Sequence, residues 1–399
     1  MNAIVSHESN AVAAVTAPFK IDAFKGSRDG RVSSQWFSRP DDQRFLSLDD
    51  LYEKVQARAE RSDTRIVDVN QIRINASRDD ADKLTMNLDG DVEVTPSHWS
   101  FGQLAGLVGA PAGYLRKLPA SLAAINLQYG VSSVREENVK AYWDNEDFSL
   151  MAATGPEYGR VFDYELVRAV KKIAGNGTGD TRWKIPGVID WATSMYNPFV
   201  DPTKDTTTLY ASDRDVFMFL VDDTHPIEIG KLADGSPDLV FRGFYAWNSE
   251  VGSKTLGIST FLLRGVCQNR NLWGVQDKNE IRLRHSKHVS HRLAYELEPA
   301  LLDYSNASDR GVVLGIQKAK EAVVARTDED RMEFLGKRGF AKAAAQNVID
   351  TVLKEEGHKP ESVWDFVNGI TAAARSIKHQ DARLDAERVA GKLMADATK

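Results

Sequence analysis

A single cysteine, Cys267, occurs in the 399-residue sequence, within GVCQNRNLWG at positions 265–274. A catalytic thiol needs a neighbouring histidine or cation to lower its pKa, and it has to be reachable by its substrate. Here Val266 and an apolar, strand-like run precede the cysteine, which is typical of a thiol that packs in a core. We therefore predict that Cys267 packs inward and is neither a nucleophile nor a metal ligand.

Three histidines follow at intervals of three residues in HSKHVSH: His285, His288 and His291. On a helix this spacing could present all three to a metal ion from one shallow face. No carboxylate lies inside the cluster, and histidines among Arg and Lys are also typical of a phosphate-binding strip. We favour a solvated basic face and leave metal binding open.

Two aspartates, Asp213 and Asp215, flank Arg214 immediately before an apolar run in ASDRDVFMFL. Paired carboxylates at the start of a strand could hold Mg²⁺ in an enzyme that acts on nucleic acid. They could equally pair with nearby groups, which is the interpretation that we favour. The sequence assigns no cofactor, and it does not decide whether the protein is an enzyme.

The most informative stretch is a basic segment, residues 239–292, which has a net charge of +6 in a chain whose formal net charge is −6. Its arginines alternate with aromatic residues, and single-stranded nucleic acid is bound by this mixture of cations and stacking rings. An ordinary sheet with an aromatic core fits the pattern equally well. The predicted nucleic-acid-binding residues are Arg242, Trp247, Asn248, Arg264, Asn269, Arg270, Arg282, Arg284, His285, Lys287 and His288.

Two spatial expectations follow from this hypothesis. Tyr245 and Trp247 are expected on opposite faces of a strand, with one ring buried and the other available for stacking. The strip Arg282, Arg284, His285, Lys287, His288 and Arg292 is expected to be largely exposed beside the sheet that contains Arg242 and Arg264.

The elements that must position these residues indicate an α+β fold, with mainly antiparallel sheets, flanking helices and a helical C-terminal region. Ser47 can cap a helix that begins at Leu48, and Asp89-Gly90 is a hairpin signal between two alternating runs. We expect a flexible arm at 1–40, an α+β body at 41–291 and helices at 292–399.

The whole-chain composition is that of an ordinary globular protein, with 42% hydrophobic and 27% charged residues. No apolar run approaches the ~20 residues that a membrane-spanning helix needs. The N-terminal residues lack the pattern of a signal peptide. We therefore expect a cytoplasmic protein that does not bind membranes.

The segments NSEVGSKTLGISTFLLRGVCQNRNLWG and RHSKHVSHRL resemble the signature of a family of phage- and plasmid-encoded proteins that is catalogued as a domain of unknown function. FGQLAGLVGAPAGYLRKLP, YGRVFDYELVRAV, LYASDRDVFMFLVDD and TAAARSIKHQDARLDAERVAGKLM also resemble its phage-borne branch. The matching residues are Asn248, Ser249, Gly252, Ser253, Arg264, Cys267, Asn269, Gly274, His285 and Lys287. Many relatives have Asn-Gly after the cysteine, where this chain has Gln268-Asn269-Arg270.

The resemblance implies a bacteriophage or other mobile genetic element, and it implies no activity. Together with the basic segment it leads to the hypothesis of an accessory protein that binds DNA, with single strands as the favoured form, in replication or recombination. An annealing-like role and a homo-oligomer are part of this hypothesis. One alternative is a metal-dependent enzyme acting on nucleic acid, and another is a regulatory or anti-defence protein that binds a host protein.

Overall fold

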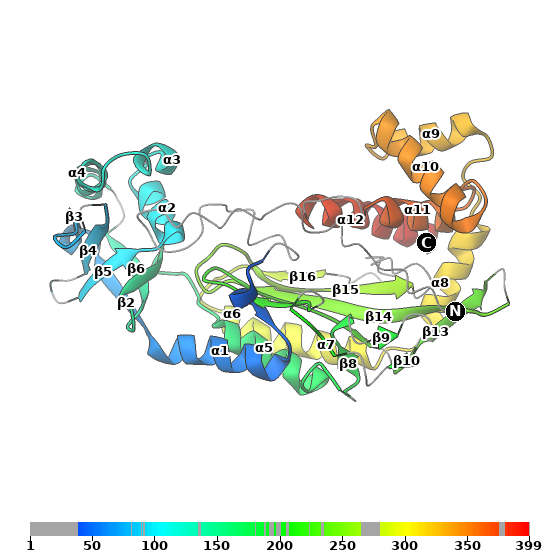
Figure 1. Cartoon of the computed structure of the whole chain (residues 1–399), viewed down its shortest axis with the longest axis horizontal. Coiled ribbons are helices and arrows are strands. Elements are labelled where there is room, and N and C mark those ends of the chain that lie inside the picture. The colour runs from blue at the N-terminus through cyan, green and yellow to red at the C-terminus, as the bar shows by residue number, and fades with distance from the viewer. Residues whose placement is uncertain are drawn as a thin grey trace, which may run out of the picture.

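Two β-sheets of different size organise the chain, and helices cover both (Figure 1). The computed structural model describes residues 39–398 except for 81, 89, 91, 135–136, 180, 187–188, 191–194, 197–200, 205–206, 223, 233–234, 265–279 and 375–379. The predicted class is confirmed: the fold is α+β, and its sheets are mainly antiparallel.

The larger sheet has eight strands, all antiparallel, in the order β1-β11-β12-β14-β15-β16, with β13 also paired to β14 and β8 to β12. Its strands are β1 (Arg44–Phe45), β8 (Trp183–Lys184), β11 (Leu209–Ala211), β12 (Val216–Asp222), β13 (Ile227–Lys231), β14 (Pro237–Asn248), β15 (Leu256–Arg264) and β16 (Glu280–Leu283). β14 and β15 are rich in aromatic and β-branched residues, which favour strands. A separate two-stranded sheet pairs β9 (Ile189–Asp190) with β10 (Met195–Tyr196).

The smaller sheet has the order β2-β6-β7-β5-β4-β3, and only the β5–β7 pair is parallel. Its strands are β2 (Ser62–Asp68), β3 (Arg73–Ala76), β4 (Leu84–Leu88), β5 (Val92–Pro96), β6 (Asn138–Asp144) and β7 (Ser149–Thr154). β4 and β5 pair as the hairpin expected from Asp89-Gly90, and Gly90 has a positive φ of 84°, which hairpin turns favour; Asp89 itself lies outside the described residues.

Helices α2 (His98–Leu107), α3 (Ala112–Leu115) and α4 (Ala120–Val131) share a core with the smaller sheet. The sequence suggests a capping box between Ser100 and Gln103, but α2 begins earlier, and Ser97 is its N-cap. The Ser97 side chain accepts a hydrogen bond from the backbone N–H of Ser100. Ser100 is therefore inside the first turn of the helix rather than at its cap.

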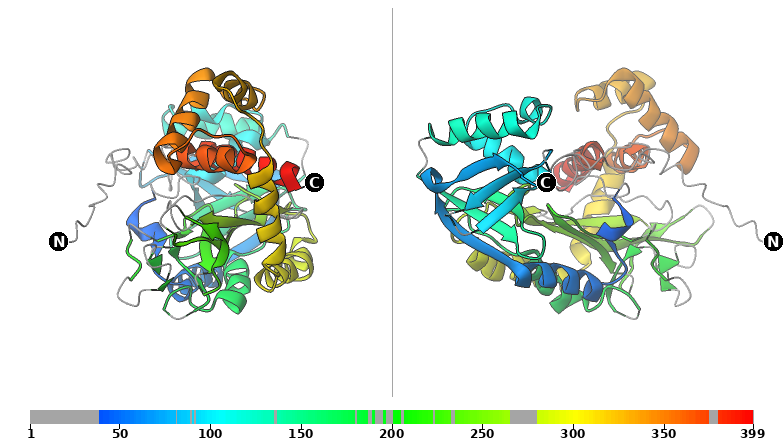
Figure 2. Two further views of the ribbon diagram at one scale, coloured as in Figure 1. Left: turned by 90° about the vertical axis from the view of Figure 1, so that its right-hand side faces the viewer. Right: turned by 60° about the vertical axis from the view of Figure 1, so that its left-hand side comes forward.

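The C-terminal region is helical, as predicted. It comprises α8 (Arg310–Glu321), α9 (Asp328–Gly336), α10 (Lys342–Glu356), α11 (Val363–Ala374) and α12 (Gln380–Thr398). The smaller sheet lies at one end of the molecule, whereas α11 and α12 lie over the larger sheet and α9 and α10 lie beyond them at the far end (Figure 1 and Figure 2). No helix in the described part of the chain combines the length and apolar character needed to cross a membrane.

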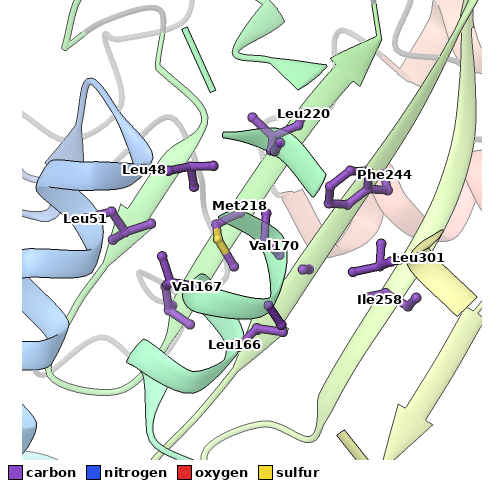
Figure 3. Packing of buried hydrophobic residues seen from close by; sticks show 14 of the residues in the cluster. Leu48, Leu51, Leu166, Val167, Val170, Met218, Leu220, Phe244, Ile258 and Leu301 are labelled. Carbon is purple, nitrogen blue, oxygen red and sulfur yellow. The ribbon is translucent and has the colours of Figure 1, made fainter. Parts of the chain in front are cut away.

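One face of the larger sheet packs on α1 (Leu48–Arg61), α5 (Asp163–Ala174), α6 (Val289–Arg292), a π-helical turn at Leu293–Leu297 and α7 (Glu298–Ser305). Figure 3 shows Leu51 of α1 and Leu166 of α5 beside Met218 of the sheet. Ser47 caps α1 as expected, because its side chain accepts from the backbone N–H of Asp50. This core holds α1 and α5 at fixed positions beneath the sheet.

The opposite face of the larger sheet is an aromatic layer that contains Phe217, Phe219, Tyr245, Trp247 and Phe261. The expectation that Tyr245 and Trp247 face opposite sides is wrong, because residues two apart on a strand share a face. Their ring centroids are 5.4 Å apart, and the residues are only 5% and 7% exposed. Both rings belong to a core, so the stacking platform predicted for nucleic acid loses most of its support.

Candidate nucleic-acid interface

A buried ionic cluster joins the two sheets. Arg58 of α1 donates from Nη2 to Oδ2 of Asp163 at 2.7 Å, and the same nitrogen is 3.2 Å from Oε2 of Glu250. Tyr142 of β6 donates its hydroxyl to that Glu250 oxygen at 2.9 Å. Burial lowers the pKa of Arg58, but the charges of Glu250 and Asp163 outweigh burial and raise it. The guanidinium therefore stays charged and links the smaller sheet to the larger one.

The turn between β14 and β15 is held by side chains from the smaller sheet and its helices. Trp99 and Gln103 of α2 both donate to the backbone oxygen of Val251, at 2.9 and 2.8 Å. The hydroxyl of Tyr158 donates to the oxygen of Ser249 at 3.0 Å, and Arg160 donates to the oxygen of Glu250. These hydrogen bonds occupy the carbonyl groups of the turn. The turn therefore has a structural role in holding the two parts of the molecule together.

Four predicted nucleic-acid-binding residues lie inside the protein, which corrects their assignment to a surface. Trp247 is in the aromatic layer, and Asn248 donates from Nδ2 to the oxygen of Val161 and to Oδ1 of Asp163. Arg242 pairs with Asp309 at 2.8 Å. A polar or charged group that leaves water must keep such partners, so these residues cannot reach a phosphate without breaking them.

Arg264 is also buried and paired, with the carboxylates of Asp238 and Glu356. Its Nε and Nη2 donate to the two Asp238 oxygens at 2.8 and 2.9 Å, which is a bidentate pair. These pairs give Arg264 a structural role. Cys267, Asn269 and Arg270 themselves lie outside the described residues.

The predicted basic strip is largely exposed at the edge of the larger sheet. Arg282, Arg284, Lys287 and His288 are exposed, whereas His285 and Arg292 are half-buried. Arg282 pairs with Glu280 at 2.6 Å and Arg292 with Glu296 at 2.6 Å. The four exposed side chains lie on one short stretch and are accessible to a phosphate backbone.

The histidine cluster does not lie on a single helix. β16 ends at Leu283 and α6 begins at Val289, so His285 and His288 precede the helix that contains His291. Among the described residues, no three or more His, Cys, Asp or Glu side chains are grouped to hold a metal ion. The helical geometry assumed for a histidine metal site is therefore wrong.

Asp215 accepts a local hydrogen bond from the Ser212 hydroxyl at 2.8 Å, as favoured from the sequence, and it also pairs with a residue 176 positions away. Arg39 donates from Nη1 and Nη2 to its two oxygens at 2.8 and 3.0 Å, and both side chains are fully buried. Burial raises the pKa of the neighbouring Asp213; the charge of Arg214 opposes this rise, and that of Asp215 adds to it. This arrangement supports a structural role for Asp215.

Folding brings further cations to the basic strip from segments far away in the sequence. The Nζ of Lys140 on β6 donates to the backbone oxygen of Tyr158 at 2.8 Å, and the Tyr158 ring stacks on His285 with centroids 4.9 Å apart. Arg160 lies 5.5 Å from the Tyr158 ring centroid. We call this set the junction surface; it comprises Lys140, Tyr158, Arg160, Arg282, Arg284, His285, Lys287 and His288.

The sequence did not single out Lys140, Tyr158 or Arg160 as binding residues. Tyr158 and Arg160 occur in YGRVFDYELVRAV, a segment that resembles the phage-borne branch of the family. Lys140 occurs in an ordinary strand pattern. No local signal pairs these positions with residues near 285. Backbone hydrogen bonding does so in the structure, because the N–H of Gly159 donates to the oxygen of His285 at 3.1 Å.

Like charges and partial burial perturb the cations of the junction surface. Burial lowers the pKa of Lys140, and the positive charge of Arg160 lowers it further. Burial also lowers the pKa of His285; the hydrogen bond to Gly159 opposes this, and Arg160 again adds to it. A bound anion would relieve both effects, because it favours the charged form of each group.

No family model, no curated protein and no solved structure matches this chain. The resemblance to the phage- and plasmid-encoded family therefore stays a prediction from its motifs. Residues from several of those motifs form hydrogen bonds with one another. The Ser249 hydroxyl donates to the backbone oxygen of Arg214, Tyr158 donates to Ser249, and His285 donates from Nδ1 to the oxygen of Gly159.

Proposed function

We propose that this protein binds the phosphate backbone of DNA, preferentially single-stranded, along the junction surface. The observation that supports the proposal is that Lys140 and Arg160 both contact Tyr158, whose ring stacks on His285 of the basic strip at 282–288. Each phosphate that such cations neutralise releases counterions, and the affinity is the sum of these gains. A phage or plasmid accessory role in replication or recombination, including annealing, is part of this proposal.

The burial of Trp247 and Tyr245 changes the expected mode of binding. Because the aromatic layer is a core, its rings are not offered to the bases, and the basic strip offers mainly cations to the backbone. Binding is then mainly electrostatic and tolerant of sequence. The metal-dependent alternative lacks a ligand cluster among the described residues.

Changing Arg282, Arg284 and Lys287 together to Ala should weaken oligonucleotide binding at all sequences. The salt dependence should flatten by up to roughly three units of log–log slope, because three phosphate contacts are lost. Fluorescence anisotropy with labelled single- and double-stranded oligonucleotides at several salt concentrations measures both quantities.

The matched control changes Arg310, Lys342 and Lys354 to Ala, which removes the same charge from exposed positions on α8 and α10. This control should keep the slope of the parent. If the first triple variant also keeps the parent's affinity and slope, the basic strip has no nucleic-acid role. The proposal would then move to a regulatory or anti-defence protein that binds a host protein.

We also propose that the protein self-associates through α4. Leu122, Ile125 and Tyr129 are 48%, 65% and 77% exposed, and their spacing places them on one side of the helix. No charged residue occurs between positions 118 and 134 in a chain of net charge −6. A twofold contact here brings no like charges together, and such a stripe is complementary to itself.

Ile125→Lys should abolish this self-association, because it places an unpaired charge at the centre of an apolar contact. We expect the dissociation constant of the dimer to rise by at least about tenfold in analytical ultracentrifugation. Leu353→Lys is the control, since Leu353 is 43% exposed on α10. A parent protein that stays monomeric at every concentration would rule out the α4 contact.

A further inference from the structure

Arg160 is a cation without a carboxylate partner among the described residues. Its Nη1 donates to the backbone oxygen of Glu250, while Nε and Nη2 have no hydrogen-bond partner and are closed off from solvent. The carboxylate of Glu250 is already engaged by the hydroxyl of Tyr142 and the backbone N–H of Asp163. A buried guanidinium with two unused donors is costly unless a further acceptor binds it.

The two unused nitrogens define the type of acceptor. Nε and Nη2 form one edge of the planar guanidinium, and that edge matches two oxygens of a phosphate or carboxylate. The guanidinium carbon of Arg160 lies 4.1 Å from the ring centroid of Tyr142, so stacking fixes the plane of the group. The edge is therefore held in a defined orientation before any ligand binds.

The surroundings of Arg160 favour an anion. Lys140 is a neighbouring cation, and the charge of Arg160 adds to the burial that lowers the pKa of Lys140 and of the nearby His285. Glu157 is the acidic residue that acts on Lys140, and it is also 3.9 Å from the Nζ of Lys287. The charge of Glu250 also acts on Arg160, but the Glu250 carboxylate is shared with Arg58 and makes no ion pair with Arg160 among the described residues.

We propose that the Nε–Nη2 edge of Arg160 binds one phosphate group, with Lys140 as a second cation beside it. This edge is closed off from solvent, so the proposal requires Lys140 or Tyr158, the half-buried neighbours of Arg160, to move aside when the anion binds. The inference rests on the proposed function in one respect, namely that the phosphate belongs to a nucleic-acid backbone. A free phosphate ion has the same chemistry, and the experiment separates the two sources.

Inorganic phosphate tests the site directly. It should raise the melting temperature of the full-length protein more than chloride at equal ionic strength, because a ligand of the folded state stabilises it. Arg160→Lys keeps a positive charge but loses the two-donor edge, and it should lower phosphate affinity by about tenfold in calorimetric titration. Equal phosphate affinity in the parent and this variant would overturn the proposal.

A second variant covers the case in which Arg160→Lys fails to fold because its bond to Glu250 is lost. Lys140→Gln leaves the Glu250 contact intact and should also weaken phosphate binding by severalfold, since it removes one charge from the site. Unchanged affinity in Lys140→Gln would contradict the assignment of Lys140. If phosphate raises the melting temperature of the parent no more than chloride does, the proposed phosphate site does not exist.

A single-stranded thymidine oligonucleotide distinguishes the two sources of the phosphate, a nucleic-acid backbone and a free phosphate ion. If phosphate stabilises the parent and the oligonucleotide competes with it, the site holds a backbone phosphate. If phosphate binds and the oligonucleotide does not, the anion site stands and the proposed DNA-binding function fails. If the oligonucleotide binds the parent and Arg160→Lys equally, DNA binding stands and the phosphate site at Arg160 fails.

Discussion

Replacing Arg58 with methionine is expected to lower the free energy of unfolding by about 3–5 kcal/mol, because it leaves buried carboxylates without their cation. Asp163 and Glu250 are both within 3.2 Å of the Arg58 guanidinium, and both are fully or almost fully buried. Methionine keeps much of the side-chain volume, so the loss is mainly electrostatic. Urea unfolding of the parent and the variant measures the difference.

The deficit of Arg58→Met should shrink as the pH falls. Burial raises the pKa of Asp163, the charge of Glu250 raises it further, and Arg58 opposes both. Without Arg58, the Asp163 carboxyl of the folded protein keeps its proton at pH values at which the unfolded chain has released it. Stability from such a group is present at low pH and is lost as the pH rises through the folded-state pKa. Unfolding at about pH 5 and about pH 7 tests this sign.

The control for Arg58→Met is Lys337→Met. Lys337 pairs with Glu333 at 2.6 Å, but these side chains are 69% and 65% exposed. An exposed pair of this kind contributes less than about 0.5 kcal/mol. If Arg58→Met and Lys337→Met lower the free energy of unfolding by similar amounts, the buried cluster does not stabilise the contact between the sheets as its geometry implies.

Gly159→Ala is expected to destabilise the protein by about 1–3 kcal/mol and to weaken oligonucleotide binding as well. A Cβ at this position would overlap the backbone oxygen of Ser286, and backbone cannot move aside as a flexible side chain can. The residue also makes two 3.1 Å hydrogen bonds with His285, one from its N–H and one to its oxygen. The methyl group should therefore push the basic strip away from Tyr158 and Arg160.

Gly106→Ala in α2 is the matched control, since its Cβ would meet nothing within 4 Å. Alanine in a helix is favoured over glycine, so this variant should be neutral or more stable by up to about 1 kcal/mol. Thermal melts and anisotropy titrations compare the two variants. If Gly159→Ala matched the parent in melting temperature and in affinity, the close approach of Gly159 to Ser286 would be irrelevant to both.

Local signals in the sequence predicted much of the secondary structure. Ser47 caps α1, and β4 and β5 pair as the hairpin that the sequence predicts around Asp89-Gly90. Each of these depends on contacts within a few residues, which is why one sequence is sufficient to find them. The α+β class and the helical C-terminal region follow from the same patterns.

The candidate site could be predicted only in part. The exposed strip at Arg282, Arg284 and Lys287 was expected from its charge, because cations without a strong reason for burial stay in water. Arg264 has the same residue type and a similar sequence context, yet it is buried against Asp238 and Glu356. Composition cannot separate these cases, since the difference depends on which carboxylates folding brings near.

The sequence by itself determined the local elements, the class of fold and the net charge of the basic segment. The tertiary structure alone decided which members of that segment face solvent. Asn248 bonds Asp163 across 85 residues, and Arg264 bonds Glu356 across 92. It also decided that Lys140 and Arg160 join the strip at His285. The physical reason is that burial and ion pairing depend on distances between residues remote in sequence, which no local pattern specifies.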